Sequence, residues 1–263
     1  MTIAVVVKVQ EGIVLATDSA TPLIDARGRQ AVYFTAQRIV RLHPELPLAL
    51  LSWGHGNVGS DSVTQLAREL SDRFTSGPPG WRLDPNAYQL RSVAERVREF
   101  VFEERIEELR QREGVTLPEL GLIVAGYAAN EPLPEFWEVQ VEGGSCADPR
   151  LVGGQETTGI TWYGQSEPIR RVVLGVSNTL RPALLAAGVH AGEISRVVKT
   201  VKDHSEELIA PPAMPIGDAI DLAEWLIHTA AQYDRFASPT KTSGGPVRIA
   251  TLSRHAGFSW VLE

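Results

Sequence analysis

Two apolar segments near the start of the chain constrain its fold more than any other feature. Residues 3–9 and 13–17 are almost continuously apolar and rich in valine and isoleucine, and residues 10–12 separate them. A half-exposed strand alternates between apolar and polar residues, whereas a strand buried on both faces does not. Because Gly12 can adopt a positive φ, the separating residues can form a tight turn. The sequence therefore predicts a buried antiparallel hairpin.

Shorter patterns of the same kinds follow along the rest of the chain. Apolar runs predict further strands at residues 31–35, 38–42, 47–53, 120–129, 136–141, 160–163, 247–252 and 258–262. Helical spacing predicts one helix capped by Ser60 or Asp61, and others over about 85–113, 194–208 and 218–233. Strands and helices in separate blocks favour antiparallel sheets covered by helices. No linker divides the sequence, so we expect a single domain over residues 1–263.

Composition narrows the classes of partner. A net charge of −7 argues against nucleic acid or an anionic membrane as the main partner. The single cysteine, Cys146, excludes an intrachain disulfide and a cysteine-rich zinc site, and the histidines lack metal-ligand spacing. No basic segment precedes an apolar stretch, and the longest apolar runs fall short of the roughly 20 residues that span a bilayer. We therefore expect a soluble, cytoplasmic protein without a metal ion.

Thr2 is the strongest candidate for a catalytic residue. If Met1 is removed, Thr2 carries a free α-amino group beside its hydroxyl, which places a nucleophile and a general base in one residue. The alternative is that Met-Thr is simply how the chain begins. Asp18, near the end of the second predicted strand, either supports Thr2 or only caps the following turn. The glycine-rich segment at 54–59 lacks the lysine of a phosphate-binding loop, which favours a strand-to-helix turn there.

Several segments together resemble a proteasome β-type subunit, a member of the N-terminal nucleophile (Ntn) hydrolases. They occur in the family's order, and they are residues 2–8, 12–19, 38–42, 52–54 and 242–247. The resemblance implies an α+β fold, the four-layer αββα sandwich in which helices flank two antiparallel sheets. It also implies a homo-oligomer, built as a ring or a helical stack. Bacterial relatives such as the Anbu group likewise begin close to the threonine.

The family's functional residues correspond to matching positions in this chain. The resemblance assigns Thr2 as the nucleophile, its α-amine as the base and Gly54 as the backbone donor to the oxyanion. Asp18 matches an aspartate that orients a cation beside the nucleophile, and Ser243 matches a serine near the threonine amine. The substrate implied is a peptide or another amide, and no organic cofactor is implied.

The chain departs from the family at supporting positions. Arg38 occupies the position of the family's lysine, and arginine supplies a cation but does not shuttle protons. Lys8 lies six residues along the strand from the nucleophile, about 20 Å away, so it does not replace that lysine. Thr240 stands where the family has an aspartate. Gln165 stands where the family has a serine, although Ser166 could serve after a small shift.

The sequence is therefore consistent with two functions. The first is threonine-dependent hydrolysis of peptides or amides, with Thr2 exposed by removal of Met1 and with Asp18 and Arg38 as electrostatic support. The second is a non-catalytic, proteasome-like assembly or scaffold protein whose surface helices bind partners. Separately, Arg38 has two interpretations, because it either supports Thr2 or pairs with Asp18 as a structural salt bridge and nothing more.

Overall fold

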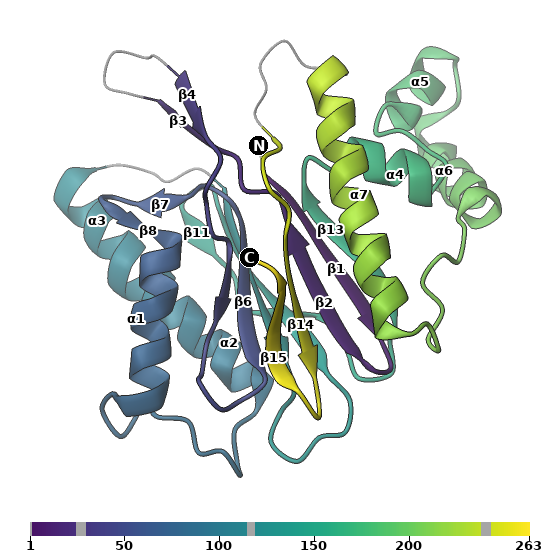
Figure 1. Cartoon of the computed structure of the whole chain (residues 1–263). Coiled ribbons are helices and arrows are strands. Elements are labelled where there is room, and N and C mark those ends of the chain that lie inside the picture. The colour runs from purple at the N-terminus through teal and green to yellow at the C-terminus, as the bar shows by residue number, and fades with distance from the viewer. Residues whose placement is uncertain (1, 25–29, 115–118, 238–242) are drawn as a thin grey trace.

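The computed structural model describes residues 2–24, 30–114, 119–237 and 243–263. Two antiparallel sheets lie face to face, and helices cover the outer face of each sheet. Figure 1 shows this arrangement, with α1 (Val63–Ser76) at the left, α7 (Ile216–Ala237) at the right and the sheets between them. The layers thus follow the order helix, sheet, sheet, helix.

Each sheet is built from strands that are distant in sequence. One consists of β1 (Ile3–Val9), β2 (Gly12–Thr17), β13 (Gly159–Gly164), β14 (Arg248–Ser253) and β15 (Gly257–Leu262). Its strand order is β13-β1-β2-β14-β15. The other consists of β5 (Ile39–Arg41), β6 (Leu48–Gly54), β9 (Leu120–Gly126), β10 (Glu135–Glu142), β11 (Ser145–Cys146) and β12 (Arg150–Gly153). Its order is β11-β10-β9-β6-β5, and β12 also pairs with β10.

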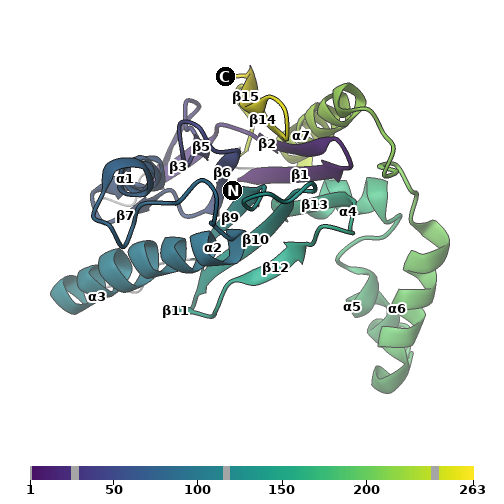
Figure 2. The same cartoon turned by 90° about the horizontal axis from the view of Figure 1, so that it is seen from below.

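Small hairpins and further helices complete the fold. The hairpins are β3 (Thr21–Ile24) with β4 (Gln30–Tyr33), and β7 (Asn57–Val58) with β8 (Asp61–Ser62). Over the β5–β6–β9–β10 sheet, α1 lies beside α2 (Leu90–Arg98), η1 (Glu99–Ile106) and α3 (Glu107–Glu113), which form one continuous helix. The other helices are α4 (Glu167–Val173), α5 (Leu180–Ala186) and α6 (Ala191–Ser205). Figure 2 shows α5 and α6 extending away from the sheets.

Strand β1 is buried on both faces, as its unbroken apolar sequence predicts. The odd-numbered residues of Ile3–Val9 pack with α4 and α7, whereas Ala4 and Val6 pack between the two sheets. Because side chains alternate along a strand, Thr2 and Lys8 belong to the same inner face as Ala4 and Val6. The two ends of β1 therefore place a polar residue at opposite edges of the core between the sheets.

The turn between β1 and β2 differs in one respect from the prediction. It lies at Gln10 and Glu11, and Gly12 already belongs to β2 without a positive φ. A Cβ atom at Gly12 would lie 2.3 Å from the carbonyl oxygen of Leu252 on the neighbouring strand β14. Glycine is therefore needed here for the close approach of two strands and not for the turn itself.

Several other boundaries also differ from the sequence prediction. The side chain of Ser62 caps α1 by accepting a hydrogen bond from the N–H of Gln65 at 3.1 Å, so the predicted caps Ser60 and Asp61 were wrong. The long helix begins at Leu90 instead of near residue 85, and its middle is π-helical. The prediction also missed β3, β7, β8, β11, β12, α4 and α5. These elements are short, so each contains too few periods of a pattern to show in the sequence.

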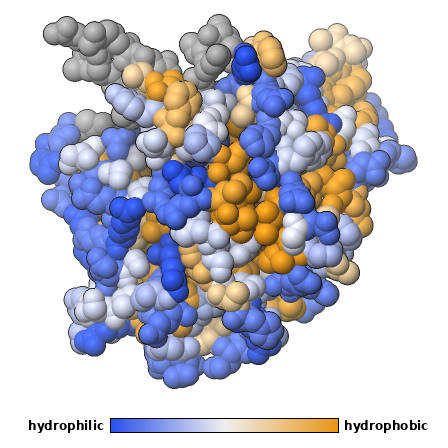
Figure 3. Space-filling view, viewed as in Figure 1, coloured by the Kyte–Doolittle hydropathy of each residue, from blue (hydrophilic) through white to orange (hydrophobic). Residues whose placement is uncertain are grey.

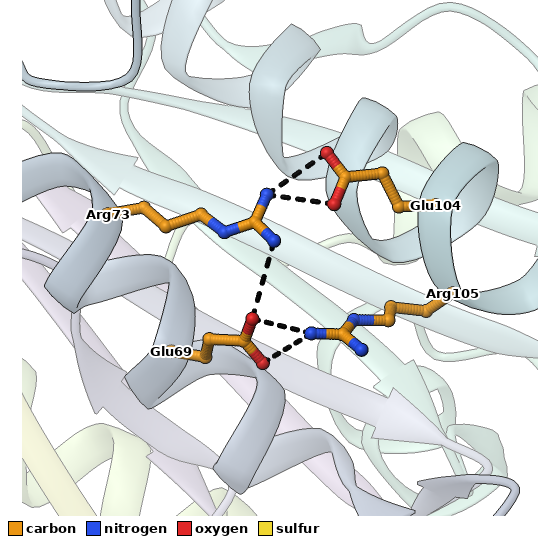
Figure 4. A network of polar contacts seen from close by, with 4 residues as sticks. All are labelled: Glu69, Arg73, Glu104 and Arg105. Carbon is orange, nitrogen blue, oxygen red and sulfur yellow. Dashed lines mark hydrogen bonds and ion pairs between the residues drawn. The ribbon is translucent and has the colours of Figure 1, made fainter. Parts of the chain in front are cut away.

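A network of charged side chains joins α1 to η1 (Figure 4). Arg73 on α1 donates to Glu104 on η1 at 2.8 Å, and Arg105 on η1 donates to Glu69 on α1 at 2.6 Å. The guanidinium of Arg73 also lies 4.4 Å from the centre of the Phe100 ring. These ion pairs are partly exposed, so each contributes modestly to stability while fixing the helices side by side.

Candidate active site

Thr2 lies directly before β1, and backbone pairing fixes its position. Its carbonyl oxygen accepts a hydrogen bond from the N–H of Gln165 at 2.8 Å, at the end of the β1–β13 ladder. A Cβ atom at Gly164 would lie 1.9 Å from this oxygen, and the φ of Gly164 is +75°. Only glycine allows the two chains to approach this closely. The register of β13 therefore determines where Thr2 lies.

The hydroxyl of Thr2 is buried and unpaired. Thr2 is 2% exposed, and its Oγ1 atom has no hydrogen-bond partner among the residues that the structure describes. A buried hydroxyl without a partner costs free energy, and such groups occur where strain or chemistry requires them. The Thr2 hydroxyl is thus not held by any other group of the described fold.

Asp18 links the start of β1 to the loop before β14. It is fully buried, and its Oδ1 accepts from the N–H of Ile3 at 2.9 Å while its Oδ2 accepts from the N–H of Gly244 at 2.8 Å. Burial raises the pKa of Asp18 from 3.8 to about 6, because the charged form loses its hydration. The two hydrogen bonds and the charge of Arg38 oppose that rise in pKa. Asp18 therefore positions the residue that follows Thr2.

Arg38 lies just before β5 and is 4% exposed. Its Nη2 donates to the carbonyl oxygen of Ala20 and to Oγ1 of Thr21, both at 3.1 Å. Its Nε has no partner among the described residues, and no ion pair within 4.0 Å joins it to Asp18 there. Burial lowers the pKa of the Arg38 guanidinium, whereas the charge of Asp18 raises it. The two groups thus interact at longer range than the direct salt bridge considered from the sequence.

A cavity of about 320 Å³ brings several of the predicted residues together. Thr2, Arg38 and Gly54 all line it, and the other lining residues are Thr21, Trp53, His55, Gly56, Asn57, Glu119 and Gly164. Gly54 has a φ of +81°, and a Cβ atom there would lie 2.4 Å from the carbonyl oxygen of Glu119. A side chain at position 54 would therefore both strain the backbone and clash with the residue directly before β9.

Ser243 is not among the described residues that line this cavity, and it contacts a carboxylate that the sequence prediction missed. Its Oγ donates to Oδ2 of Asp234 at 2.6 Å, and Nε2 of Gln165 donates to Oδ1 of Asp234 at 3.4 Å. Asp234 is 2% exposed. Because the backbone N–H of Gln165 also bonds Thr2, this network runs from Ser243 to the candidate nucleophile. Thr240, at the family's aspartate position, lies outside the described residues.

The periodicity of α7 is the signal that could have revealed Asp234. The buried face of α7 includes Ala223, Leu226, Ile227 and Ala230. The next residue with helical spacing after Ala230 is Asp234, four positions later. An acidic residue that continues an apolar stripe is rarely buried unless it has partners. That pattern in the sequence therefore marks a buried carboxylate that needs hydrogen-bond partners.

Across residues 2–24, 30–114, 119–237 and 243–263, no group of three or more His, Cys, Asp or Glu side chains is arranged to hold a metal ion. Within the same ranges, no helix has both the length and the apolar character needed to cross a bilayer.

Comparisons with known proteins identify the fold. No protein-family model matches the sequence, and no curated protein matches it. A solved structure of a mutant of Anbu from Hyphomicrobium sp. strain MC1 is similar, with a TM-score of 0.55 and 14% sequence identity. The match covers 100% of this chain and 88% of that one. At this identity the likeness concerns the fold alone, and it confirms the α+β sandwich of the Ntn type predicted from the sequence.

Proposed function

We propose that this protein is a threonine-dependent peptide or amide hydrolase whose nucleophile is Thr2 after removal of Met1. One observation carries the proposal: the unpaired hydroxyl of Thr2 lines a cavity that also contains the buried guanidinium of Arg38. A nucleophile, a fixed cation and space for a substrate thus share one site. The fold shared with Anbu adds a scaffold but no information on activity.

The proposed reaction uses groups within the first residue of the processed chain. The Thr2 hydroxyl oxygen attacks the amide carbonyl carbon, and the hydroxyl proton passes to the α-amine. The backbone N–H of Gly54 and the charge of Arg38 stabilise the resulting oxyanion. The carbon–nitrogen bond then breaks, and the leaving amine takes the proton. Water finally hydrolyses the ester that Thr2 holds, with the α-amine again acting as base.

The remaining polar groups position these atoms. Asp18 anchors Ile3 and adds a negative charge near Arg38, and the pKa of about 6 leaves it ionised at neutral pH. Asp234 orients Ser243 and Gln165, and Gln165 in turn holds the carbonyl group of Thr2. In this scheme protons move through the Thr2 amine, because arginine stays protonated throughout.

The alternative function is a non-catalytic assembly protein of the same fold. Arg38 is the observation that favours it, because its guanidinium cannot exchange protons as a lysine can. In that case the buried polar groups serve stability alone, and the Thr2 hydroxyl needs no free amine beside it. The state of the N-terminus and the reactivity of Thr2 distinguish the two functions.

Intact-mass measurement and labelling test the proposal. We expect the purified protein to lack Met1 and to gain the mass of one β-lactone molecule, located on Thr2 by peptide mapping. Thr2→Ala should abolish labelling and lower hydrolysis of a peptide panel by at least about 10³-fold, as loss of a nucleophile does. Thr2→Ser is the matched control, because it keeps both hydroxyl and amine and should still be labelled. Retention of Met1, or equal hydrolysis by wild type and Thr2→Ala, would show that the proposal is wrong.

Exposed apolar surface on α7 supports the proposed homo-oligomer. In Figure 3, apolar surface gathers at the centre of the view and toward α7, whereas the surface over α1 is largely hydrophilic. Trp225, Tyr233 and Phe236 on α7 are 48%, 38% and 83% exposed. Contiguous exposed apolar side chains commonly mark contacts between proteins. We propose that copies of this chain meet here, and Phe236→Ser should shift the species seen by native mass spectrometry toward monomer.

A further inference from the structure

A second and larger cavity adjoins the one that contains Thr2. Its volume is about 570 Å³, and it shares Thr21, Arg38, Gly56 and Asn57 with the smaller cavity. The shared residues form a common wall, so a substrate held at Thr2 can extend a side chain from one cavity into the other. The larger cavity is therefore placed to receive a residue next to the amide that is cleaved.

The lining of the larger cavity is positively charged, although the protein as a whole carries a net charge of −7. Its charged residues are Arg38 and Arg68, and no Asp or Glu occurs among the described residues that line it. Polar groups of Thr21, Ser52 and Asn57 lie in the same walls. Of these, Ser52 Oγ already donates to the carbonyl oxygen of Arg38, and Asn57 Nδ2 donates to that of Gly59. The smaller cavity differs, because Glu119 there accompanies Arg38.

Neither arginine has a carboxylate partner among the described residues. Arg38 bonds a carbonyl oxygen and a hydroxyl, and its buried Nε is unpaired. Arg68 is an exposed residue of α1. Among the described residues, its Nη2 donates only to the neutral amide oxygen of Gln37, at 2.9 Å. Guanidinium groups that have no directly bonded carboxylate favour one as a ligand, because it accepts charge-assisted hydrogen bonds.

We propose that this cavity binds the carboxylate side chain of an acidic substrate residue, so that the enzyme cleaves the amide directly after glutamate or aspartate. The inference rests on the proposed function and names the substrate class of the same site. Arg38 contacts the carboxylate at the shared wall, and Arg68 approaches it from the solvent side. Arg68 is thus a specificity residue, whereas Arg38 serves both specificity and the charge beside Thr2.

The test compares fluorogenic peptides that differ only by Glu or Gln before the reporter amide. These side chains have the same shape, so their ratio of kcat/KM measures charge recognition alone. We expect the Glu peptide to be preferred by about tenfold, because hydrogen bonds to charged groups are stronger than neutral ones. Arg68→Gln should lower this ratio at least threefold. Arg82→Gln, which removes an exposed arginine that lines neither cavity, should leave the ratio unchanged.

The inference would be overturned if both peptides were cleaved equally or the Gln peptide were preferred. It would also be overturned if Arg68→Gln left the ratio unchanged. Each of these outcomes leaves the hydrolase proposal intact. A failure to cleave any peptide would instead contradict the hydrolase proposal. In that event, the inference is tested by calorimetry, which measures the affinity of the Thr2→Ala protein for amidated peptides that end in Glu or Gln. Tenfold tighter binding of the Glu peptide supports the inference, and equal or absent binding overturns it. A Gln peptide with a free terminal carboxyl group shows whether a terminal carboxylate binds instead of the side chain.

Discussion

The two ends of β1 both bury polar groups on the same inner face, yet they differ in what those groups contact. At one end, Lys8 is 2% exposed, and its Nζ donates to the carbonyl oxygens of Gly154, Gln155 and Thr157, the first at 2.8 Å. The cavity there measures about 90 Å³. At the other end, Thr2 Oγ1 and Arg38 Nε have no partners among the described residues, and cavities of about 320 and 570 Å³ adjoin them.

The difference shows that burial of a polar group does not by itself mark a functional site. All three donor hydrogens of Lys8 are used by the backbone, so its charge is compensated within the fold. Burial lowers the pKa of Lys8, while Glu135 and Glu156 act against that shift. The Thr2 end instead leaves donors and acceptors unpaired beside open space. Polar groups at the Thr2 end therefore remain without partners among the described residues, whereas the ammonium group of Lys8 is fully paired.

The largest expected effect concerns the ionisation of Asp18, at the Thr2 end. Its pKa is raised to about 6, so between about pH 4 and 6 the folded protein holds a proton that the unfolded chain has released. The free energy of unfolding should fall as pH rises through this interval, by about 3 kcal/mol for this group. Urea denaturation at pH 4 and pH 7 measures the change. Asp18→Asn, which cannot titrate, should lack this contribution, and identical pH dependences for both proteins would refute the assignment.

Removal of the cation at the same end should have the next largest effect. Arg38→Gln is expected to lower kcat/KM by about 100-fold, which corresponds to nearly 3 kcal/mol, because the oxyanion loses a fixed charge. Arg38→Lys keeps the charge and should recover most of the activity. If Arg38→Gln retained wild-type kcat/KM on the peptides cleaved best, Arg38 would not stand in for the family's lysine.

A substitution at the opposite end of β1 should affect stability and spare activity. Lys8→Met keeps the length of the side chain but leaves three carbonyl oxygens without their donor. We expect the free energy of unfolding in urea to fall by about 2 kcal/mol, the scale of an unsatisfied buried polar group. The kcat/KM of the folded protein should stay within about twofold of wild type. A tenfold loss of kcat/KM would remove the distinction between the two ends.

The smallest expected effect is at Asp234, which reaches Thr2 only through other residues. Asp234→Asn removes the negative charge and replaces the oxygen that faces Ser243 by an amide donor, so the contact with Ser243 must reverse its direction and both bonds lose their charge assistance. We expect kcat to fall about tenfold with KM unchanged, since only positioning of the nucleophile is disturbed. A rise in KM with unchanged kcat would mean that Asp234 shapes substrate binding instead. Asp218→Asn, at the exposed first turn of α7, is the matched control.

The parts of the site that lie close to Thr2 in the sequence could be predicted better than those that lie far from it in the sequence. An antiparallel hairpin that turns at residues 10 and 11 pairs Ala4 with Thr17, so the start of β1 must lie beside Asp18. Gly54 and Ser243 are 52 and 241 positions from Thr2, and only the family resemblance connected them to it.

Other contacts depend on packing that no single segment encodes. Asp234 meets Ser243 because α7 crosses the β1–β2–β14 sheet at a particular angle, and periodicity alone gives the buried face but not the partner. The short helix α5 has no buried residue, so its sequence shows no apolar stripe. The edge strand β12 is half-exposed and four residues long, and its pairing with β10 includes a register shift. Such elements are determined by their neighbours more than by their own residues.

The pairing that holds Thr2 has a practical consequence for anyone who produces this protein. Ile3 is paired with Gly164, and its N–H donates to Asp18, so contacts that begin at Ile3 hold the start of β1 in position. On the proposed mechanism, an affinity tag fused to the amino terminus would block hydrolysis, because the threonine nitrogen would be an amide. A tag at the carboxyl terminus, after the exposed end of β15, leaves that nitrogen free.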